Sequence, residues 1–437
     1  MRSARPAGLD ARLAAHDLLV DALERRLALD ARFAAHPGLD DVSARDRAFV
    51  RNLVTSCLRW LGVLDRLIDD TIERPLPARA RGARHVLRLG LTQLLILDTP
   101  PHAAVDGAVK QAEARRMGAY KGLINAVLRR LAREGRDRLA ALDPPRIATP
   151  DWLWRRWCAT YGEDTARAIA AAHLAEPPLD LTVADDGAVS AEMLGAAVLP
   201  TGALRIARPR GRIDRLPGYD EGSWWVQDAA AALPARLLGP VDGRTVIDAC
   251  AAPGGKTLQL LAAGARVVAV ERSAARLGTL RANLARFGRD ATLIEADAAT
   301  WAPSAQADAV LLDAPCSGTG TLRRNPDIAW SKRPEDVDRL AGYQARLLDA
   351  ALRWLAPGGT LVYAVCSLEP EEGPVIVADA LVRDATIERV PVAAAEIGGL
   401  AEAITAEGDV RTTPALWSDI GGLDGFYAAR LRRRRES

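Results

Sequence analysis

From residue 236 onward, short apolar runs alternate with longer amphipathic stretches, and this alternation constrains the fold more than any other feature. The longer stretches, 273–287 and 336–355, are typical of helices, and Pro357-Gly358-Gly359 is predicted to end the second. Strands that alternate with helices form parallel sheets covered on both faces, so we predict a doubly wound α/β domain over 236–437. The predicted strands are 245–248, 267–271, 292–295, 309–312 and 360–363.

The first 140 residues carry a different pattern. Apolar residues from Val50 to Leu61 recur every three or four positions, as on one face of a helix, and Ser43 is placed to cap that helix. Residues 1–140 are therefore predicted to form an all-helical bundle. Residues 141–235 are rich in proline and contain short apolar runs such as 179–183, which predicts a connector and a small mixed α/β subdomain.

Composition excludes several classes of protein. The 437 residues contain no apolar run of about 18 residues, so no membrane span is expected, and the N-terminus lacks the apolar block of a signal peptide. Five cysteines without paired spacing and five scattered histidines argue against a disulfide framework and against a metal site. We expect a protein of the reducing cytoplasm, and a monomer, because no exposed apolar heptad pattern is evident.

Charge is distributed unevenly although the net charge is only +2. Residues 71–140 contain 14 Lys and Arg against 6 Asp and Glu, a local net charge of +8. Such a basic region is the usual footprint of a protein that binds a phosphate backbone, although an ordinary solvated helical surface has the same composition.

The segment Asp248–Thr257 places two glycines between a predicted strand and a predicted helix. Its spacing matches neither the G-x-G-x-x-G pattern nor the phosphate loop of ATP-binding proteins, which argues against NAD and ATP. Two glycines still allow the backbone to approach a ligand closely. Lys256 follows them directly in a chain that has only four lysines. The predicted cofactor loop consists of Cys250, Ala251, Ala252, Pro253, Gly254, Gly255 and Lys256.

Two acidic residues follow the next two predicted strands. Glu271 is placed to accept hydrogen bonds from ribose hydroxyls, and Asp297 to contact an adenine amino group. Together they fit an adenosine cofactor without a pyrophosphate, of which S-adenosylmethionine is the leading case. The alternative for each acid is a structural role as a helix cap.

Two cysteines follow the last two predicted strands. Cys316 lies in Asp313–Gly318 and Cys366 in Tyr363–Ser367, and residues just past the ends of parallel strands line the ligand crevice. A thiol in that position can attack a substrate, and a second thiol can help to reverse the attack. The alternative is that both are small buried hydrophobic residues.

These segments resemble successive motifs of the RNA cytosine-5 methyltransferases. The resemblance covers about residues 220–437, including Trp225–Asp228 and Asp424–Tyr427. In the N-terminal part, Pro100–Val109 and Gly122–Arg129 resemble the NusB-like RNA-binding domain. This pairing is similar to that of the bacterial B-type 16S rRNA cytosine-5 methyltransferases. The resemblance implies a Rossmann-like methyltransferase domain, S-adenosylmethionine as cofactor and 16S rRNA as partner.

The resemblance also implies roles for the site residues. Cys366 would add to C6 of cytosine, Cys316 would assist elimination, and Asp313 would contact the cytosine or the amino group of the cofactor. The alternative makes Cys316 the nucleophile, because DNA cytosine-5 methyltransferases use a Pro-Cys thiol. Two other functions remain open: a methyltransferase that acts on tRNA or another RNA, and a non-enzymatic RNA chaperone with a vestigial transferase fold.

The segment after Cys316 offers possible RNA contacts. Trp330 is placed either to stack on a base or to pack in the core. Four cations are placed to hold the flanking phosphates: Arg323, Arg324, Lys332 and Arg333.

Overall fold

The computed structural model describes residues 8–40, 42–184, 189–209 and 211–435, and the chain forms two compact units. The first comprises Met1–Glu176 with Leu322–Arg333, and the second Pro177–Thr321 with Pro334–Ser437. This division differs from the predicted borders at 140 and 235. The prolines after residue 140 separate helices that pack together, with Trp157 buried among them, rather than separating domains.

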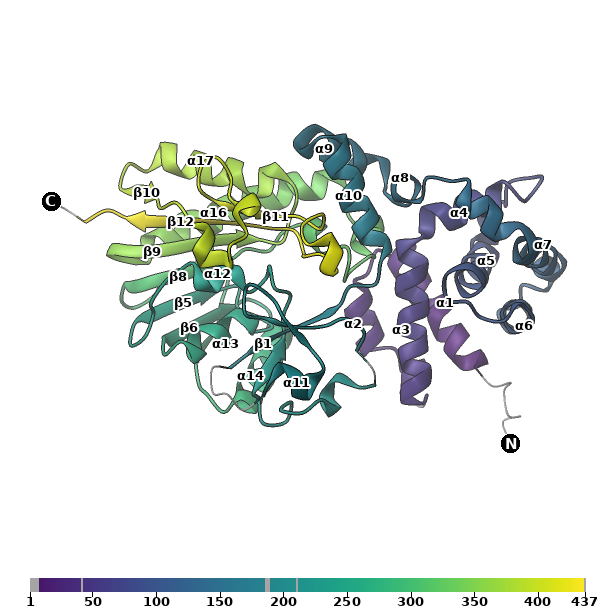
Figure 1. The fold of residues 1–437 in the computed structure, drawn as a ribbon, viewed down its shortest axis with the longest axis horizontal. Helices are drawn as coiled ribbons and strands as arrows, with labels where there is room; N and C mark the ends of the chain where they lie inside the picture. Colours follow the sequence, from purple (N-terminus) through teal and green to yellow (C-terminus); the bar gives the residue numbers. More distant parts are fainter. Residues whose placement is uncertain (1–7, 41, 185–188, 210, 436–437) are drawn as a thin grey trace. The chain divides into compact units, whose positions relative to one another are not determined.

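The first unit is helical throughout its described residues, as predicted (Figure 1). Ser43 caps a helix, because its Oγ accepts a hydrogen bond of 3.1 Å from the amide of Asp46. The predicted apolar face from Val50 to Leu58 is buried. No helix in the described part of the chain is both long and apolar enough to cross a membrane. The helices are α1 Leu9–Leu23, α2 Leu29–Ala34, α3 Ala44–Arg59, α4 Leu61–Asp69, α5 Arg81–Leu91, α6 Pro101–Ala114, α7 Lys121–Ala140, α8 Pro144–Ala148, α9 Asp151–Tyr161, α10 Glu163–Leu174 and α15 Ile328–Ser331.

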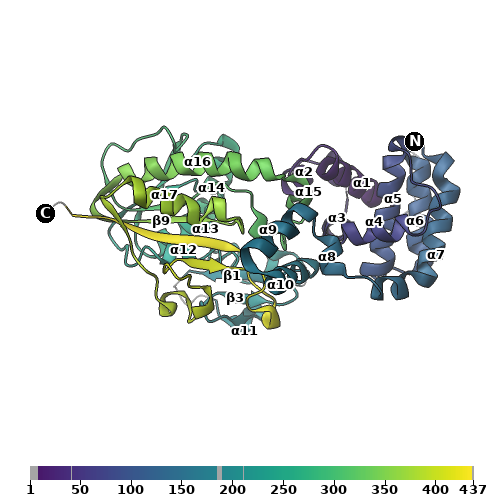
Figure 2. The same ribbon diagram turned by 90° about the horizontal axis from the view of Figure 1, so that it is seen from above.

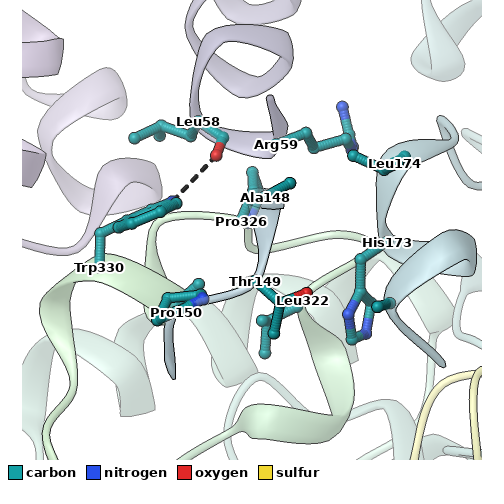
Figure 3. Close-up of a pocket in the computed structure, with 12 residues that line it drawn as sticks. Leu58, Arg59, Ala148, Thr149, Pro150, His173, Leu174, Leu322, Pro326 and Trp330 are labelled. Carbon is teal, nitrogen blue, oxygen red and sulfur yellow. Dashed lines mark hydrogen bonds between the residues drawn. The ribbon is translucent and has the colours of Figure 1, made fainter. Parts of the chain in front are cut away.

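The segment Leu322–Arg333 belongs to this helical unit although it lies far away in the sequence. The indole Nε1 of Trp330 donates a hydrogen bond of 2.9 Å to the carbonyl oxygen of Leu58, beside a small pocket (Figure 3). Arg59 donates one of 2.7 Å to the carbonyl oxygen of Arg323.

These contacts bear on the alternatives for the segment. Trp330 packs against the helical core, as one alternative predicts, while its base-stacking role stays a prediction. Arg323 is only 2% exposed, so the prediction that it holds a phosphate of bound RNA is wrong. Sequence periodicity could not reveal this burial, because the residues that contact the segment, such as Leu58 and Arg59, lie far away in the sequence.

The second unit begins with a small antiparallel sheet in the order β2-β3-β1-β4. The predicted strand 179–183 is present as β1. Its Asp180 forms two hydrogen bonds of 2.7 Å with the guanidinium of Arg205, and both side chains are buried. The elements are β1 Leu179–Val183, α11 Ala191–Leu194, β2 Ala197–Val198, β3 Leu204–Ile206, β4 Trp224–Val226 and α12 Leu233–Arg236.

The main sheet of this unit has the order β10-β12-β9-β8-β5-β6-β7, with β11 paired to β12. Strands β5 to β9 pair in parallel and β12 is antiparallel to β9, which confirms the doubly wound, mainly parallel, Rossmann-like fold. All five predicted strands are present. The elements are β5 Thr245–Ala249, α13 Gly255–Ala262, β6 Arg266–Glu271, α14 Ala274–Phe287, β7 Thr292–Glu295, β8 Ala307–Asp313, α16 Pro334–Arg353, β9 Leu355–Val365, α17 Pro374–Arg383, β10 Ile387–Arg389, β11 Val410–Thr412 and β12 Phe426–Arg433.

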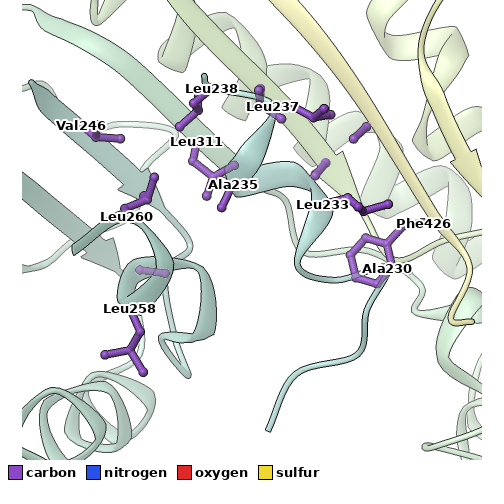
Figure 4. Packing of buried hydrophobic residues seen from close by; sticks show 14 of the residues in the cluster. Ala230, Leu233, Ala235, Leu237, Leu238, Val246, Leu258, Leu260, Leu311 and Phe426 are labelled. Carbon is purple, nitrogen blue, oxygen red and sulfur yellow. The ribbon is translucent and has the colours of Figure 1, made fainter. Parts of the chain in front are cut away.

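Both faces of this sheet are buried, because successive side chains of a strand point to opposite faces. Val246 and Leu311 pack with α12 and α13 in one core (Figure 4). Ile247 and Leu312 face the other core, which contains residues of α16 and α17. Figures 1 and 2 show these helices on either side of the strands.

One predicted boundary is wrong. Pro357-Gly358-Gly359 does not follow the helix directly but lies inside β9, since α16 already ends at Arg353. The register between β8 and β9 shifts between Ala307 and Ala309, which accommodates these residues at the start of the strand.

The buried pair Asp180–Arg205 provides a test of this fold. Asp180→Ala leaves a guanidinium buried without its carboxylate, so we expect the free energy of unfolding to fall by about 3–5 kcal/mol. Urea denaturation followed by tryptophan fluorescence measures the change. Asp214→Ala, which removes the partner of the more exposed Arg212, serves as the control and should leave the midpoint unchanged. Equal midpoints for both variants would contradict this account.

Candidate active site

The candidate site lies where the strand order of the main sheet reverses. β5 and β8 are neighbours, but the chain continues from β5 to β6 on one side and from β8 to β9 on the other. The connections after these two strands therefore leave in opposite directions and open a crevice at the carboxyl ends. The predicted site residues all lie at or just after the carboxyl ends of β5 to β9.

The predicted cofactor loop connects β5 to α13 and is held from α14. Arg276 donates to the carbonyl oxygen of Ala252, and the Asn283 amide donates a hydrogen bond of 2.8 Å to that of Pro253. Gly254 has φ of 108°, and a Cβ there would lie 2.4 Å from Cδ1 of Leu280. Only glycine fits this turn without strain, which explains why the loop needs it.

Asp248 lies at the end of β5 beneath the loop. Its Oδ2 accepts a hydrogen bond of 2.5 Å from Thr257 of α13, and its Oδ1 is buried without a hydrogen-bond partner. Burial raises the pKa of Asp248 to about 7, and the nearby Asp313 adds to the shift while Thr257 opposes it. This carboxyl group therefore ties the loop to the sheet.

Lys256 and Asp313 meet across the crevice. The ammonium of Lys256, on the first turn of α13, lies 2.7 Å from Oδ2 of Asp313 at the end of β8. The lysine side chain is mostly buried and also lies over the ring of Phe426, 5.2 Å from its centroid. The ion pair connects the predicted cofactor loop to the loop that carries Cys316, a link that the sequence pattern did not reveal.

The two acids after β6 and β7 have different surroundings. Glu271 is 2% exposed; its Oε1 accepts from the amide of Ser273, while Oε2 is buried without a hydrogen-bond partner and lies 3.4 Å from Arg276. That unsatisfied oxygen fits a ribose hydroxyl donor. Asp297 accepts a hydrogen bond of 2.6 Å from the hydroxyl of Tyr343.

The environment of Asp297 keeps it ionised. Burial alone would raise its pKa, but the hydrogen bonds from Tyr343 and the amide of Ala299 hold the pKa below its usual range. Both acids accept a hydrogen bond from the amide two residues later, but neither is a helix cap, because Ser273 caps α14 and the described residues between β7 and β8 form no helix.

The two candidate thiols lie side by side. Cys316 follows β8 and Cys366 follows β9, and their sulfur atoms are 3.3 Å apart. The hydrogen bond with Cys366 and burial together hold the pKa of Cys316 above its usual range, so Cys316 keeps its proton. Burial likewise raises the pKa of Cys250, with a further contribution from Glu271. A protonated Cys316 can donate its S–H to the sulfur of Cys366.

A buried polar network behind the thiols was not predicted from the sequence. Its centre is Glu372, in the turn after β9, which bonds to Ser317, Ser367 and Gln344. All four side chains are at most 1% exposed. The local sequence Pro370-Glu-Glu372 is typical of an exposed turn, so no sequence signal indicated that this acid is buried.

The described residues contain no group of three or more His, Cys, Asp or Glu that could hold a metal ion. The crevice instead combines an ion pair, two thiols and an unsatisfied carboxylate oxygen within one loop system. This arrangement suits an adenosine cofactor on one side of the switch point and nucleophilic attack on the other.

Gly254→Ala provides a test of the loop. A non-glycine residue at this backbone conformation costs about 1–3 kcal/mol, so we expect the affinity for S-adenosylmethionine to fall about tenfold or more. Titration calorimetry measures the affinity. Gly278→Ala on α14 is the matched control, because a Cβ there meets no atom within 4 Å and its affinity should equal that of the wild type. A Gly254→Ala protein that binds normally would rule out the strained turn.

The raised pKa of Asp248 predicts a pH dependence of stability. A carboxyl group whose pKa is higher in the folded state stabilises the fold at low pH, and this contribution is lost as pH rises from about 4 to about 7. Asp248→Asn should therefore flatten the stability profile between these values. Urea midpoints at several pH values measure it, with the exposed Asp308→Asn as control. Parallel profiles for wild type and Asp248→Asn would show that Asp248 titrates normally.

Comparison with known proteins identifies the family. Residues 235–432 match the family model described as 16S rRNA methyltransferase RsmB/F, and residues 9–133 match the NusB family. The ribosomal RNA small subunit methyltransferase B of Shigella sonnei is 38% identical over 364 residues, which cover 79% of this chain and 84% of that protein.

Solved structures agree with the fold. PH0851 aligns over 99% of both chains with a TM-score of 0.75 and 23% identity. A methyltransferase homolog protein from Pyrococcus horikoshii is 28% identical, covers 64% of this chain and 93% of its own, and gives a TM-score of 0.52. The chain therefore belongs to the family of ribosomal RNA small subunit methyltransferase B, and its cofactor is S-adenosylmethionine.

Proposed function

We propose that the protein methylates C5 of a cytosine in 16S rRNA through a covalent bond between Cys366 and C6 of the base. The observation that supports this most directly is the pair of sulfur atoms 3.3 Å apart at the ends of β8 and β9. S-adenosylmethionine supplies an electrophilic methyl group when bound. Cytosine C5 is a poor nucleophile, so the protein must activate the base.

Cys366 performs that activation. Its thiolate forms a bond to C6, and the electrons of the C5–C6 double bond make C5 nucleophilic. After C5 is methylated, the C5 proton passes to a base such as water, the C–H electron pair restores the C5–C6 double bond, and the S–C6 electron pair leaves with the sulfur of Cys366. Cys316 assists this elimination, because it retains a proton that it can donate to the departing sulfur. These roles require both thiols to be reduced, which fits the cytoplasm predicted from the sequence.

The remaining residues position the reactants. We propose that Glu271 binds the ribose through its unsatisfied Oε2, and that Asp297 accepts from the adenine amino group. The loop from Cys250 to Lys256 approaches the cofactor with its backbone. Asp313, oriented by Lys256, accepts a hydrogen bond from the cytosine or from the amino group of the cofactor. The target base must leave its stack to reach the crevice.

The test is transfer of a labelled methyl group from S-adenosylmethionine to deproteinised small-subunit rRNA. We expect Cys366→Ala to lower the rate by about three orders of magnitude or more, since it removes the nucleophile. Cys316→Ala should accumulate a protein–RNA adduct that survives a denaturing gel. Cys158→Ala, in α9, is the matched control and should retain full activity.

Three other outcomes would change the proposal. An adduct that accumulates in Cys366→Ala instead would make Cys316 the nucleophile. Transfer to tRNA but not to rRNA would move the substrate to another RNA. A wild-type protein that fails to bind S-adenosylmethionine in calorimetry would favour the non-enzymatic RNA chaperone with a vestigial transferase fold.

A further inference from the structure

Glu372 is a carboxylate with no exposed surface, yet no cation is within ion-pairing distance of it in the described part of the chain. Four donors surround its two oxygen atoms. Oε1 accepts from the amide of Ser317 at 2.8 Å and from Gln344 at 3.0 Å. Oε2 accepts from the hydroxyls of Ser317 and of Ser367, the latter at 2.6 Å. Four hydrogen bonds therefore satisfy a fully buried carboxyl group.

The donors belong to the two loops that carry the thiols. Ser317 directly follows Cys316 in the loop after β8, and Ser367 directly follows Cys366 in the loop after β9. The two serine hydroxyls also lie 3.1 Å apart. One carboxyl group thus bonds to the residue next to each thiol, and the two sulfur atoms lie 3.3 Å apart.

Neighbouring contacts fix Glu372 itself. Its carbonyl oxygen accepts a hydrogen bond of 2.6 Å from the hydroxyl of Tyr363 on β9. Gln344 on α16 bonds both to the carboxylate and, at 2.9 Å, to the carbonyl oxygen of Pro315. Burial of a polar group costs free energy unless it is hydrogen-bonded, and here all four donors bond to the side chain of Glu372.

We infer that Glu372 is a positioning residue that sets the separation of the Cys316 and Cys366 thiols. It touches neither sulfur and acts through Ser317 and Ser367. Another link between the loops, the hydrogen bond of 3.0 Å from the Gly320 amide to the Cys366 carbonyl oxygen, does not involve Glu372. Loss of the carboxylate should therefore loosen the thiol pair without separating the strands.

The consequence for methylation depends on the proposed function, but thiol separation can be measured independently of it. In glutathione buffers the Cys316 and Cys366 thiols give two electrons and two protons to glutathione disulfide, forming one protein disulfide and two glutathione thiols. The equilibrium constant reports the effective concentration of one thiol at the other. Peptide mass analysis separates this disulfide from those of the remaining cysteines.

We expect Glu372→Ala to lower the effective concentration about tenfold or more. Glu372→Gln should stay within about threefold of wild type, because its amide oxygen can accept from the Ser317 amide and its NH₂ can donate to the two rotatable hydroxyls. Ser367→Ala removes one of the four donors and provides a milder loss, several-fold, if Glu372→Ala does not fold. Glu402→Ala, an exposed acid on another loop, is the control.

Cofactor binding by calorimetry establishes that each variant is folded. A folded Glu372→Ala or Ser367→Ala protein whose effective thiol concentration equals that of wild type would overturn the inference. In the methylation assay, Glu372→Ala should lower kcat with an unchanged KM for RNA, and Glu372→Gln should restore it. If wild type methylates no RNA, the proposed function fails, while the thiol equilibrium still decides the role of Glu372.

Discussion

The parallel pairing of β5 with β8 is the constraint on which the site depends. These strands are central to the main sheet, and their side chains alternate between two separate hydrophobic cores. Because each face must be covered, the helices that follow β5 and β8 are directed to opposite faces, and the ends of both strands are left open between them. This arrangement determines where the predicted site residues lie. The cofactor loop, the two acids and the two thiols lie at or just after the ends of consecutive strands, around one crevice.

Two polar connections then join loops that the sheet alone would leave independent. The Lys256–Asp313 ion pair connects the cofactor side to the substrate side, and the Glu372 network connects the two thiol loops to each other. The Glu372 network is fully buried and Lys256 is mostly buried, and electrostatic interactions of buried groups are less screened than those at the surface. Lys256, Asp313 and Glu372 therefore connect the loops that carry the site residues.

The sequence predicted what depends on local periodicity and on position after a strand. All five strands of the main sheet, the Ser43 cap and the placement of Cys316 beside Cys366 belong to this group, because each depends on neighbours in the chain or on the parallel topology. Burial of polar residues could not be predicted in the same way. Arg323 and Glu372 occupy polar segments, and their surroundings include partners that are distant in the sequence, such as Arg59 and Ser317.

The segment Leu322–Arg333 belongs to the helical unit but is inserted in the sequence of the other unit. The chain passes from one unit to the other after Glu176, after Thr321 and after Arg333, so no single cut in the gene separates them. Asp327 accepts a hydrogen bond from the amide of Leu29, and Trp330 depends on the carbonyl of Leu58. In a transferase without residues 1–176, Asp327 would lose its hydrogen bond from Leu29 and Trp330 its hydrogen bond to Leu58. Modular exchange of the RNA-binding half therefore requires coordinated change inside the transferase sequence itself.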